Sequence, residues 1–126
     1  MAMTTRIQSI SISVADQERA LAFYTEVLEF ELRADVEVWP GARYIEVVPP
    51  GSNVGLVLLT PGSEIPIAVR MGTDDAETAY ARLAEAGATL HNDGVIVIGD
   101  SPRMFFFADQ DGNGLVYLEE ESPEAS

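Results

Sequence analysis

The chain has 126 residues, 47% of them hydrophobic, which suits one domain with a core of its own. It has no cysteine, which excludes disulfides, thiolate nucleophiles and cysteine-containing zinc sites. The 21 acidic residues outnumber seven arginines, and the net charge of −14 disfavours nucleic acid and anionic membranes as partners. Without a signal-peptide pattern or an apolar run of about 20 residues, we expect a cytoplasmic protein.

The first half predicts a strand, a helix and three further strands. Apolar and serine residues alternate over 7–14, which is the period of a strand with unlike faces. Asp16 then reads as a helix N-cap, and an apolar stripe at helical spacing follows over 20–28. Segments rich in strand formers come next, at 30–36, 43–48 and 54–60.

The second half repeats this order after a seam at Pro61-Gly62-Ser63. A strand is expected over 65–71, and Asp74 with Glu77 resembles a capping box that begins a helix. Gly87 is placed to end that helix. Four strand segments complete the half, at 88–90, 95–98, 103–108 and 115–119.

The repeat predicts an α+β fold. It consists of two tandem βαβββ modules, about 6–60 and about 65–119, within one domain that ends in an acidic tail at 120–126 and is expected to fray there. We expect the curved mixed sheets to form a concave cup, with the helices on the outer face. Strand alternation directs the serines at 9, 11 and 13 into the cup, and likewise Ala68, Arg70 and Gly72.

Two motifs resemble a known family. Ser13-Val14-Ala15-Asp16 with the helix after it, and the segment from Phe106 to Leu115 around Asp109-Gln110-Asp111-Gly112-Asn113-Gly114, are similar to the vicinal oxygen chelate superfamily. That superfamily includes glyoxalase I, extradiol dioxygenases and bleomycin-resistance proteins. The resemblance covers about residues 6 to 119. It implies the cup, but no particular activity.

Enzymes of this family hold a divalent metal at four strand positions. Carried over residue by residue, the resemblance places these positions at Ser9, Leu58, Ala68 and Val116. None is a carboxylate or an imidazole, and a serine hydroxyl is a poor ligand without such partners. His91, the only histidine, reads as a solvated loop residue. We therefore expect no metal and no other cofactor, as in the bleomycin-resistance type.

The candidate ligand-binding residues line the predicted cup. Trp39 could stack on a planar ligand, or pack on its own sheet or a partner chain. Arg70 could clamp a carboxylate or carbonyl oxygen, or form a structural ion pair. One or two of the three consecutive phenylalanines must face the cup. The full set is Ser9, Ser11, Trp39, Leu56, Leu58, Ala68, Arg70, Phe105, Phe107 and Val116.

Three hypotheses for the function follow. The first is a cytoplasmic homodimer that binds and sequesters a hydrophobic or aromatic small molecule, for example an antibiotic, without catalytic residues. The second is a glyoxalase-like lyase or isomerase with an atypical site, in which Glu46, His91 or Tyr44 serves as the general base; Glu46 otherwise reads as a surface charge. The third is an interaction domain with no small ligand.

Overall fold

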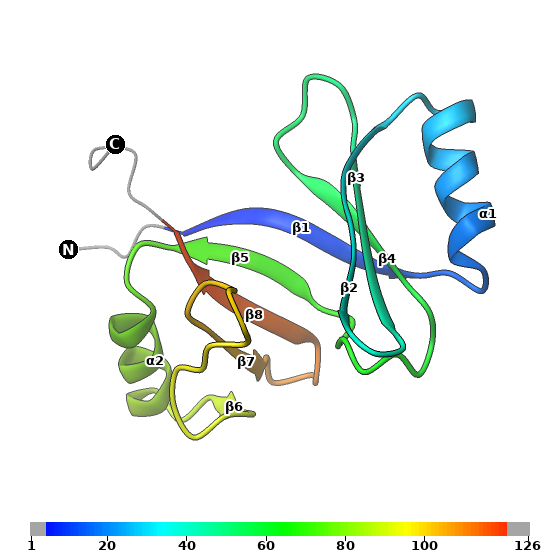
Figure 1. The fold of residues 1–126 in the computed structure, drawn as a ribbon. Helices are drawn as coiled ribbons and strands as arrows, with labels where there is room; N and C mark the ends of the chain where they lie inside the picture. The colour runs from blue at the N-terminus through cyan, green and yellow to red at the C-terminus, as the bar shows by residue number, and fades with distance from the viewer. Residues whose placement is uncertain (1–4, 121–126) are drawn as a thin grey trace. The chain divides into compact units, whose positions relative to one another are not determined.

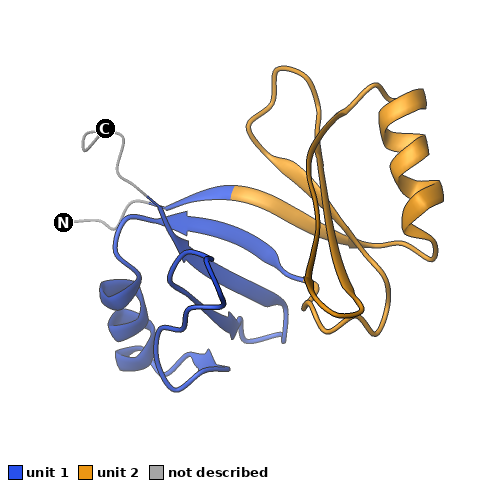
Figure 2. Ribbon diagram, in the orientation of Figure 1, with its two compact units in different colours: residues 1–7, 68–126 blue, residues 8–67 orange. Residues whose placement is uncertain are grey.

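The computed structural model describes residues 5–120 of the chain. It divides into two compact units, of which unit 1 comprises residues 1–7 and 68–126 and unit 2 comprises residues 8–67 (Figure 2). Each unit combines one helical segment with four strands (Figure 1), which confirms the α+β class and the two βαβββ modules. The prediction that the tail over 120–126 frays lies, except for Glu120, outside the described residues. No helix in the described range is long and apolar enough to cross a membrane.

Unit 2 is a four-stranded mixed sheet with a helix on one face. Its strands lie in the order β2-β3-β4-β1, with β1 parallel to β4 and the other pairs antiparallel. The second strand extends through Trp39, three residues beyond the predicted end, because the chain reverses tightly at Gly41, where φ is +85°. The elements are β1 (Thr5–Ser13), α1 (Gln17–Ala22), the π-helix η1 (Phe23–Val27), β2 (Glu31–Trp39), β3 (Ala42–Val48) and β4 (Gly55–Leu59).

The helix of unit 2 begins where the sequence predicts. The Asp16 side chain accepts a hydrogen bond from the Arg19 amide, 3.1 Å away, as an N-cap does. The helix then packs on β3 and β4. Its apolar stripe joins the buried side chains of Ile45, Val47 and Leu58. We call this side the helix face of unit 2 and the other side its opposite face.

Unit 1 repeats the architecture with the strand order β5-β8-β7-β6. The first pair is parallel and the others are antiparallel. The N-cap of its helix is Asp75, one residue after the predicted Asp74, and its carboxylate accepts from the Thr78 amide at 3.0 Å. Gly87 ends the helix at φ +78°, as predicted. The elements are β5 (Val69–Thr73), α2 (Ala76–Glu85), β6 (Thr89–Leu90), β7 (Met104–Ala108) and β8 (Gly114–Glu119).

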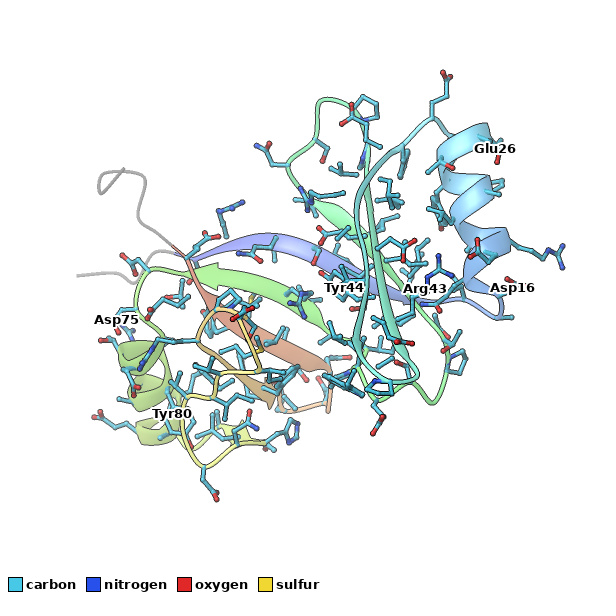
Figure 3. All side chains as sticks on the ribbon, viewed as in Figure 1. Asp16, Glu26, Arg43, Tyr44, Asp75 and Tyr80 are labelled. Atoms are coloured by element: carbon cyan, nitrogen blue, oxygen red, sulfur yellow. The ribbon has the colours of Figure 1, made fainter. Side chains whose placement is uncertain are left out.

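The segment 95–98 does not form the predicted strand. Only Ile96 pairs, through an isolated bridge to Met104, and the backbone turns at Gly99, where φ is +56°. Asn92 holds the beginning of this loop to the sheet, since its Oδ1 accepts from the Phe106 amide at 2.7 Å. The Tyr80 hydroxyl of α2 donates to the Asn92 carbonyl at 2.7 Å (Figure 3). The loop is therefore tied to both β7 and α2.

Candidate functional site

A carboxylate is buried on the opposite face of unit 2. Glu46 pairs with Val57 across β3 and β4, so its side chain projects away from α1, while its neighbours Ile45 and Val47 enter the helix-face core. The residue is 8% exposed. The prediction that Glu46 is a surface charge is wrong, because the alternation that buries Ile45 and Val47 directs Glu46 onto the other covered face of the sheet.

Two side chains satisfy this carboxylate. The Tyr44 hydroxyl, two residues earlier on the same strand (Figure 3), donates to Glu46 Oε1 at 2.8 Å. Arg33 donates from Nε to Oε2 at 2.9 Å, and its Nη2 contacts the same oxygen. Arg33 reaches this face from a register shift in β2, between Leu32 and Ala34. A buried charge is tolerated when it is paired and hydrogen-bonded in this way.

The glycine at 55 makes room for this ion pair. A Cβ atom at Gly55 would stand 2.5 Å from Glu46 Oε2 and 2.7 Å from Arg33 Nη2. The parallel register places Ser9 beside Gly55, on the same face. Ser9 is 1% exposed, and its Oγ has no hydrogen-bond partner within the part of the chain that the structure describes. An unpaired hydroxyl thus lies on the same face of the sheet as the hydrogen-bonded carboxylate of Glu46.

An apolar patch adjoins this polar cluster on the same face. The Trp39 ring packs on buried aliphatic side chains, and its indole N–H donates to Glu64 Oε2 at 2.8 Å. Trp39 thus packs on its own sheet, and stacking on a planar ligand stays a prediction. The patch also receives Tyr44, so aromatic surface and hydrogen-bonding groups lie together. Its buried members are Ala42, Val57, Leu59 and Ile65.

The register corrects two predicted site residues of β4. Leu58 pairs with Ile12, and both join the helix-face core together with Leu56. The prediction that Leu56 and Leu58 line the cup is therefore wrong. The alternation of β4 is shifted by one residue, so Val57 and Leu59 lie on the side away from α1. The sequence does not show which residues of β4 face the helix, because every residue after Gly55 is apolar.

In unit 1 the structure separates the predicted residues between the two faces. Ala68 and Val116 lie in the cluster on the side of this sheet away from α2, which we call the opposite face of unit 1. Arg70 shares that face, because it pairs with Val116. Phe105 and Phe107 instead pack with Ala79 and Tyr80 of α2, so their predicted position in the cup is wrong. Phe106 is the phenylalanine that faces away from the helix.

The donor set does not fit the divalent metal that the family resemblance implies. In unit 2, Ser9 offers one hydroxyl, and Val57, which takes the face predicted for Leu58, offers no donor. In unit 1, neither Ala68 nor Val116 offers a donor. The nearby carboxylate of Glu46 is already held by Arg33. Within residues 5–120, no three acidic or histidine side chains group closely enough to hold a metal ion. His91 is exposed on the loop after β6.

Arg43 forms a second charged cluster, at the start of α1. It donates to Asp35 and Glu18 at 2.7–2.9 Å, and so joins α1 to β2 and β3 (Figure 3). The hydrogen bond and charge of Arg43 outweigh desolvation and hold the pKa of Asp35 below its ordinary value of 3.8. The same partners raise the pKa of Arg43. This cluster is structural, since every group in it is paired.

Sequence reasoning missed three members of the polar cluster. The sequence pattern predicts no role for Arg33 or Gly55, and for Tyr44 it predicts only the role of a general base. Tyr44 and Glu46 do carry a signal, because polar residues two apart in an apolar strand share a face. The sequence carries no such signal for Arg33, because the orientation of its side chain depends on the register shift in β2.

Several known proteins are similar to this chain, and one of them, a methylmalonyl-CoA epimerase, shares its fold. The chain is 29% identical over 121 residues to the uncharacterized protein YetH of Bacillus subtilis (strain 168), covering 88% of this chain and 95% of the relative. Methylmalonyl-CoA epimerase from Mycobacterium tuberculosis is 20% identical with a TM-score of 0.75, over 94% of this chain and 89% of that one. TnmS3, an antibiotic binding protein from Streptomyces sp. CB03234, is 32% identical with a TM-score of 0.43, over 96% and 99%.

The family model that matches the chain is the Glyoxalase/Bleomycin resistance protein/Dioxygenase superfamily. The match runs over residues 6–117 and so includes both βαβββ modules. It agrees with the resemblance carried by the two sequence motifs. The chain therefore belongs to the Glyoxalase/Bleomycin resistance protein/Dioxygenase superfamily.

Proposed function

We propose that this protein binds and sequesters a hydrophobic or aromatic small molecule without a metal ion. The observation that carries the proposal is the opposite face of unit 2, where the Trp39 patch adjoins the buried cluster around Glu46. Apolar surface with a few fixed polar groups is typical of small-molecule sites. The donors available around Ser9 do not suit a divalent ion, so the polar contacts to a ligand would be direct hydrogen bonds.

The proposed ligand contacts are a reduced set of those expected from the sequence. In unit 2 they are Ser9, Ser11 and Trp39. In unit 1 they are Ala68, Arg70 and Val116, which share that unit's opposite face. The residues that pack on a helix, namely Leu56, Leu58, Phe105 and Phe107, no longer belong to the set.

The proposal also includes an oligomeric state and a cellular compartment. The protein acts as a homodimer in the cytoplasm, and an antibiotic is one class of ligand consistent with an aromatic and apolar surface. Light scattering coupled to size exclusion measures the mass of the particle directly. A monomeric mass at micromolar concentration would remove the homodimer from the proposal and leave the binding claim standing.

The test is a titration of the full chain with a broad panel of aromatic and polycyclic drugs. Trp39 is the only tryptophan, so quenching of its emission reports ligand near the patch. Equilibrium dialysis with Trp39→Phe checks that a hit also binds without this fluorophore. We expect stoichiometric binding that is unchanged by EDTA, with the compound recovered intact. No binding across the panel, or binding that requires an added divalent ion, would contradict the proposal.

A second function is favoured by one observation. The buried Glu46 and the half-buried Tyr44 form a hydrogen-bonded pair that could move a proton at a carbon next to a carbonyl group. In a glyoxalase-like isomerase, Glu46 would take this proton and return it to the neighbouring carbon. The hemithioacetal of methylglyoxal and glutathione is the probe. Conversion to a thioester by the native chain, lost in Glu46→Gln, would establish this activity in place of sequestration.

A further inference from the structure

We propose that the Asp93-Gly94 bond, in the loop between β6 and β7, is a site of spontaneous isoaspartate formation in the folded protein (Figure 1). The reaction rebuilds the main chain at this bond and needs no reactant other than water. The inference does not depend on the proposed function. It concerns unit 1 alone, which contains both residues.

An aspartyl-glycyl bond can rearrange because the side-chain carboxyl group lies within reach of the next backbone nitrogen. The Gly94 nitrogen attacks Cγ of the protonated Asp93 carboxyl group and loses its proton. A C–N bond forms, and the hydroxyl group of the carboxyl leaves with that proton as water. The resulting succinimide ring takes up one water molecule and opens at either carbonyl. Opening at the main-chain carbonyl gives isoaspartate, in which the chain continues through Cγ, and glycine favours ring closure because no Cβ hinders the attacking nitrogen.

The sequence contains three bonds of this kind and by itself ranks a different one first. They are Asp93-Gly94, Asp111-Gly112 and Asn113-Gly114. An asparagine amide closes the ring faster at neutral pH, with loss of ammonia, because an aspartate is then mostly ionised and its carboxylate resists attack. Asn113-Gly114 should therefore react first in an unfolded chain. In the folded chain, hydrogen bonding decides which of the three bonds can close the ring.

The turn between β7 and β8 restrains two of these bonds. Asp109 Oδ1 accepts from the amides of Asp111 and Asn113, each at 2.9 Å, and Oδ2 accepts from the Asn113 side-chain Nδ2 at 2.7 Å. The Gly112 nitrogen, which would have to attack Asp111, donates to the Asp109 carbonyl at 3.1 Å. The group that must be attacked in Asn113 and the nitrogen that must attack Asp111 are thus both held in hydrogen bonds.

The bond after Asp93 has no such restraint. The Asp93 side chain is exposed, and within residues 5–120 neither its carboxylate nor the Gly94 amide has a hydrogen-bond partner. An added Cβ at Gly94 would meet nothing within 4 Å, so the space around this bond is open. Ring closure requires rotation about the bonds of Asp93, and a segment with few hydrogen bonds changes its conformation most easily. The folded structure therefore favours Asp93-Gly94 over the other two bonds.

The modification falls between two anchored points of the loop. Asn92 accepts hydrogen bonds from the Phe106 amide and the Tyr80 hydroxyl, each at 2.7 Å. Ile96 pairs with Met104 through two backbone hydrogen bonds and packs on the opposite face of unit 1. Isoaspartate at position 93 lengthens the main chain between Asn92 and Ile96 by one methylene group. It thus alters the segment that joins Ile96 of this face to the anchored Asn92.

The experiment follows isoaspartate in the full chain, kept folded at neutral pH for several weeks. An isoaspartyl methyltransferase with labelled S-adenosylmethionine counts the isoaspartyl groups, and peptide mapping with electron-transfer fragmentation places each of them in the sequence. We expect the isoaspartate at Asp93 to exceed that at Asp111 and at Asn113 several-fold. In the chain unfolded by urea, we expect Asn113 to react fastest.

Two variants check the site independently of the peptide map. Asp93→Glu keeps the charge, but a glutamate would have to close a larger and less favourable ring. Asp111→Glu is the matched control, since it makes the same change at the other Asp-Gly bond. Most of the methyl groups that the native chain takes up should be missing from Asp93→Glu and present in Asp111→Glu. Circular dichroism checks that both variants are folded, and the peptide map of the native chain decides alone if one of them is not.

The contrary results are equally specific. Absence of isoaspartate at Asp93 in the folded chain would overturn the proposal, and so would more isoaspartate at Asp111 or Asn113 than at Asp93. If Asp93 also reacts fastest in urea, the hydrogen bonds around Asp109 do not decide the site, and the structural argument is overturned. Ligand binding is tested separately by the drug panel and is affected by none of these outcomes.

Discussion

The carboxylate of Glu46 occupies the space that a side chain at Gly55 would fill, with Oε2 only 2.5 Å from the place of a Cβ atom. Glu46 belongs to β3 and Gly55 to β4, and Ser9 of β1 lies beyond the glycine. The missing side chain at 55 thus leaves room for the ion pair between the buried Glu46 and the partly exposed Arg33. The composition of the polar cluster depends on this glycine.

Gly55→Ala should therefore destabilise the protein. The added methyl group must displace the Glu46 carboxylate and the Arg33 guanidinium, and such overpacking costs about 1–3 kcal/mol. Chemical denaturation measures the loss in free energy of unfolding. Gly94→Ala is the control, because nothing lies within 4 Å of its added Cβ, and we expect a change within about 0.5 kcal/mol. Equal stability of the two variants would refute the close packing at Gly55.

Phe105 and Phe106 should differ sharply in their contribution to stability. Phe105 is fully buried on the helix face and contacts the Tyr80 ring edge-to-face at 5.1 Å, so Phe105→Ala should cost about 3–5 kcal/mol. Phe106 is half-buried on the opposite face, and Phe106→Ala should cost clearly less. Urea unfolding of both variants measures the two losses in free energy of unfolding. A larger loss for Phe106 would reverse the face assignment of β7.

Asp35 should titrate at a lower pH than an ordinary aspartate. Arg43 holds the pKa of Asp35 below 3.8, so the folded state binds this proton less readily than the unfolded chain. The stabilisation is complete well above pH 3.8 and is lost as the pH falls below 3.8 through the folded-state pKa. Carboxyl-detected NMR titration should show this low value, and Arg43→Gln should return it towards 3.8.

Arg82→Gln is the matched control for Asp35, because Arg43, and not Arg82 of α2, lowers the pKa of Asp35. The titration of Asp35 should be the same in this variant as in the native chain. Arg43→Gln should also lose less stability than the native chain when both are acidified below pH 3.8. A pKa of Asp35 that is unaffected by Arg43→Gln would exclude the ion pair as the cause.

Glu64→Ala should expose the indole N–H of Trp39. The Glu64 carboxylate accepts this N–H at 2.8 Å, while the ring stays packed on the apolar patch. We expect faster hydrogen exchange of the indole N–H in NMR spectra, and a stability change within about 1 kcal/mol, because the bond is at the surface. The control is Glu31→Ala, because Glu31 is exposed and lies on β2, the strand that contains Trp39. This variant should leave the indole signal unchanged. An unaltered exchange rate in Glu64→Ala would contradict the hydrogen bond.

The sequence by itself determined the repeat, most of the elements and one of the sheet faces. Alternation with unlike residues, as over Ser9 to Ser13, leaves a single phase that directs Ile12 to the helix-face core and the serines to the other face. The helix signals at Asp16 and Gly87 depend on local backbone geometry. The structure confirmed these features. The family motifs are also local in the sequence, and the match over residues 6–117 agrees with them.

Only the tertiary structure decided the faces of β4 and β7 and the composition of the polar cluster. Strands that are apolar at nearly every position fit either phase, so pairing of Leu58 with Ile12 and packing of Phe105 on α2 were required to orient them. The burial of Glu46 depends on partners from other parts of the chain, the bulged Arg33 and the small Gly55. Such contacts join residues distant in sequence, and local pattern carries no information about them.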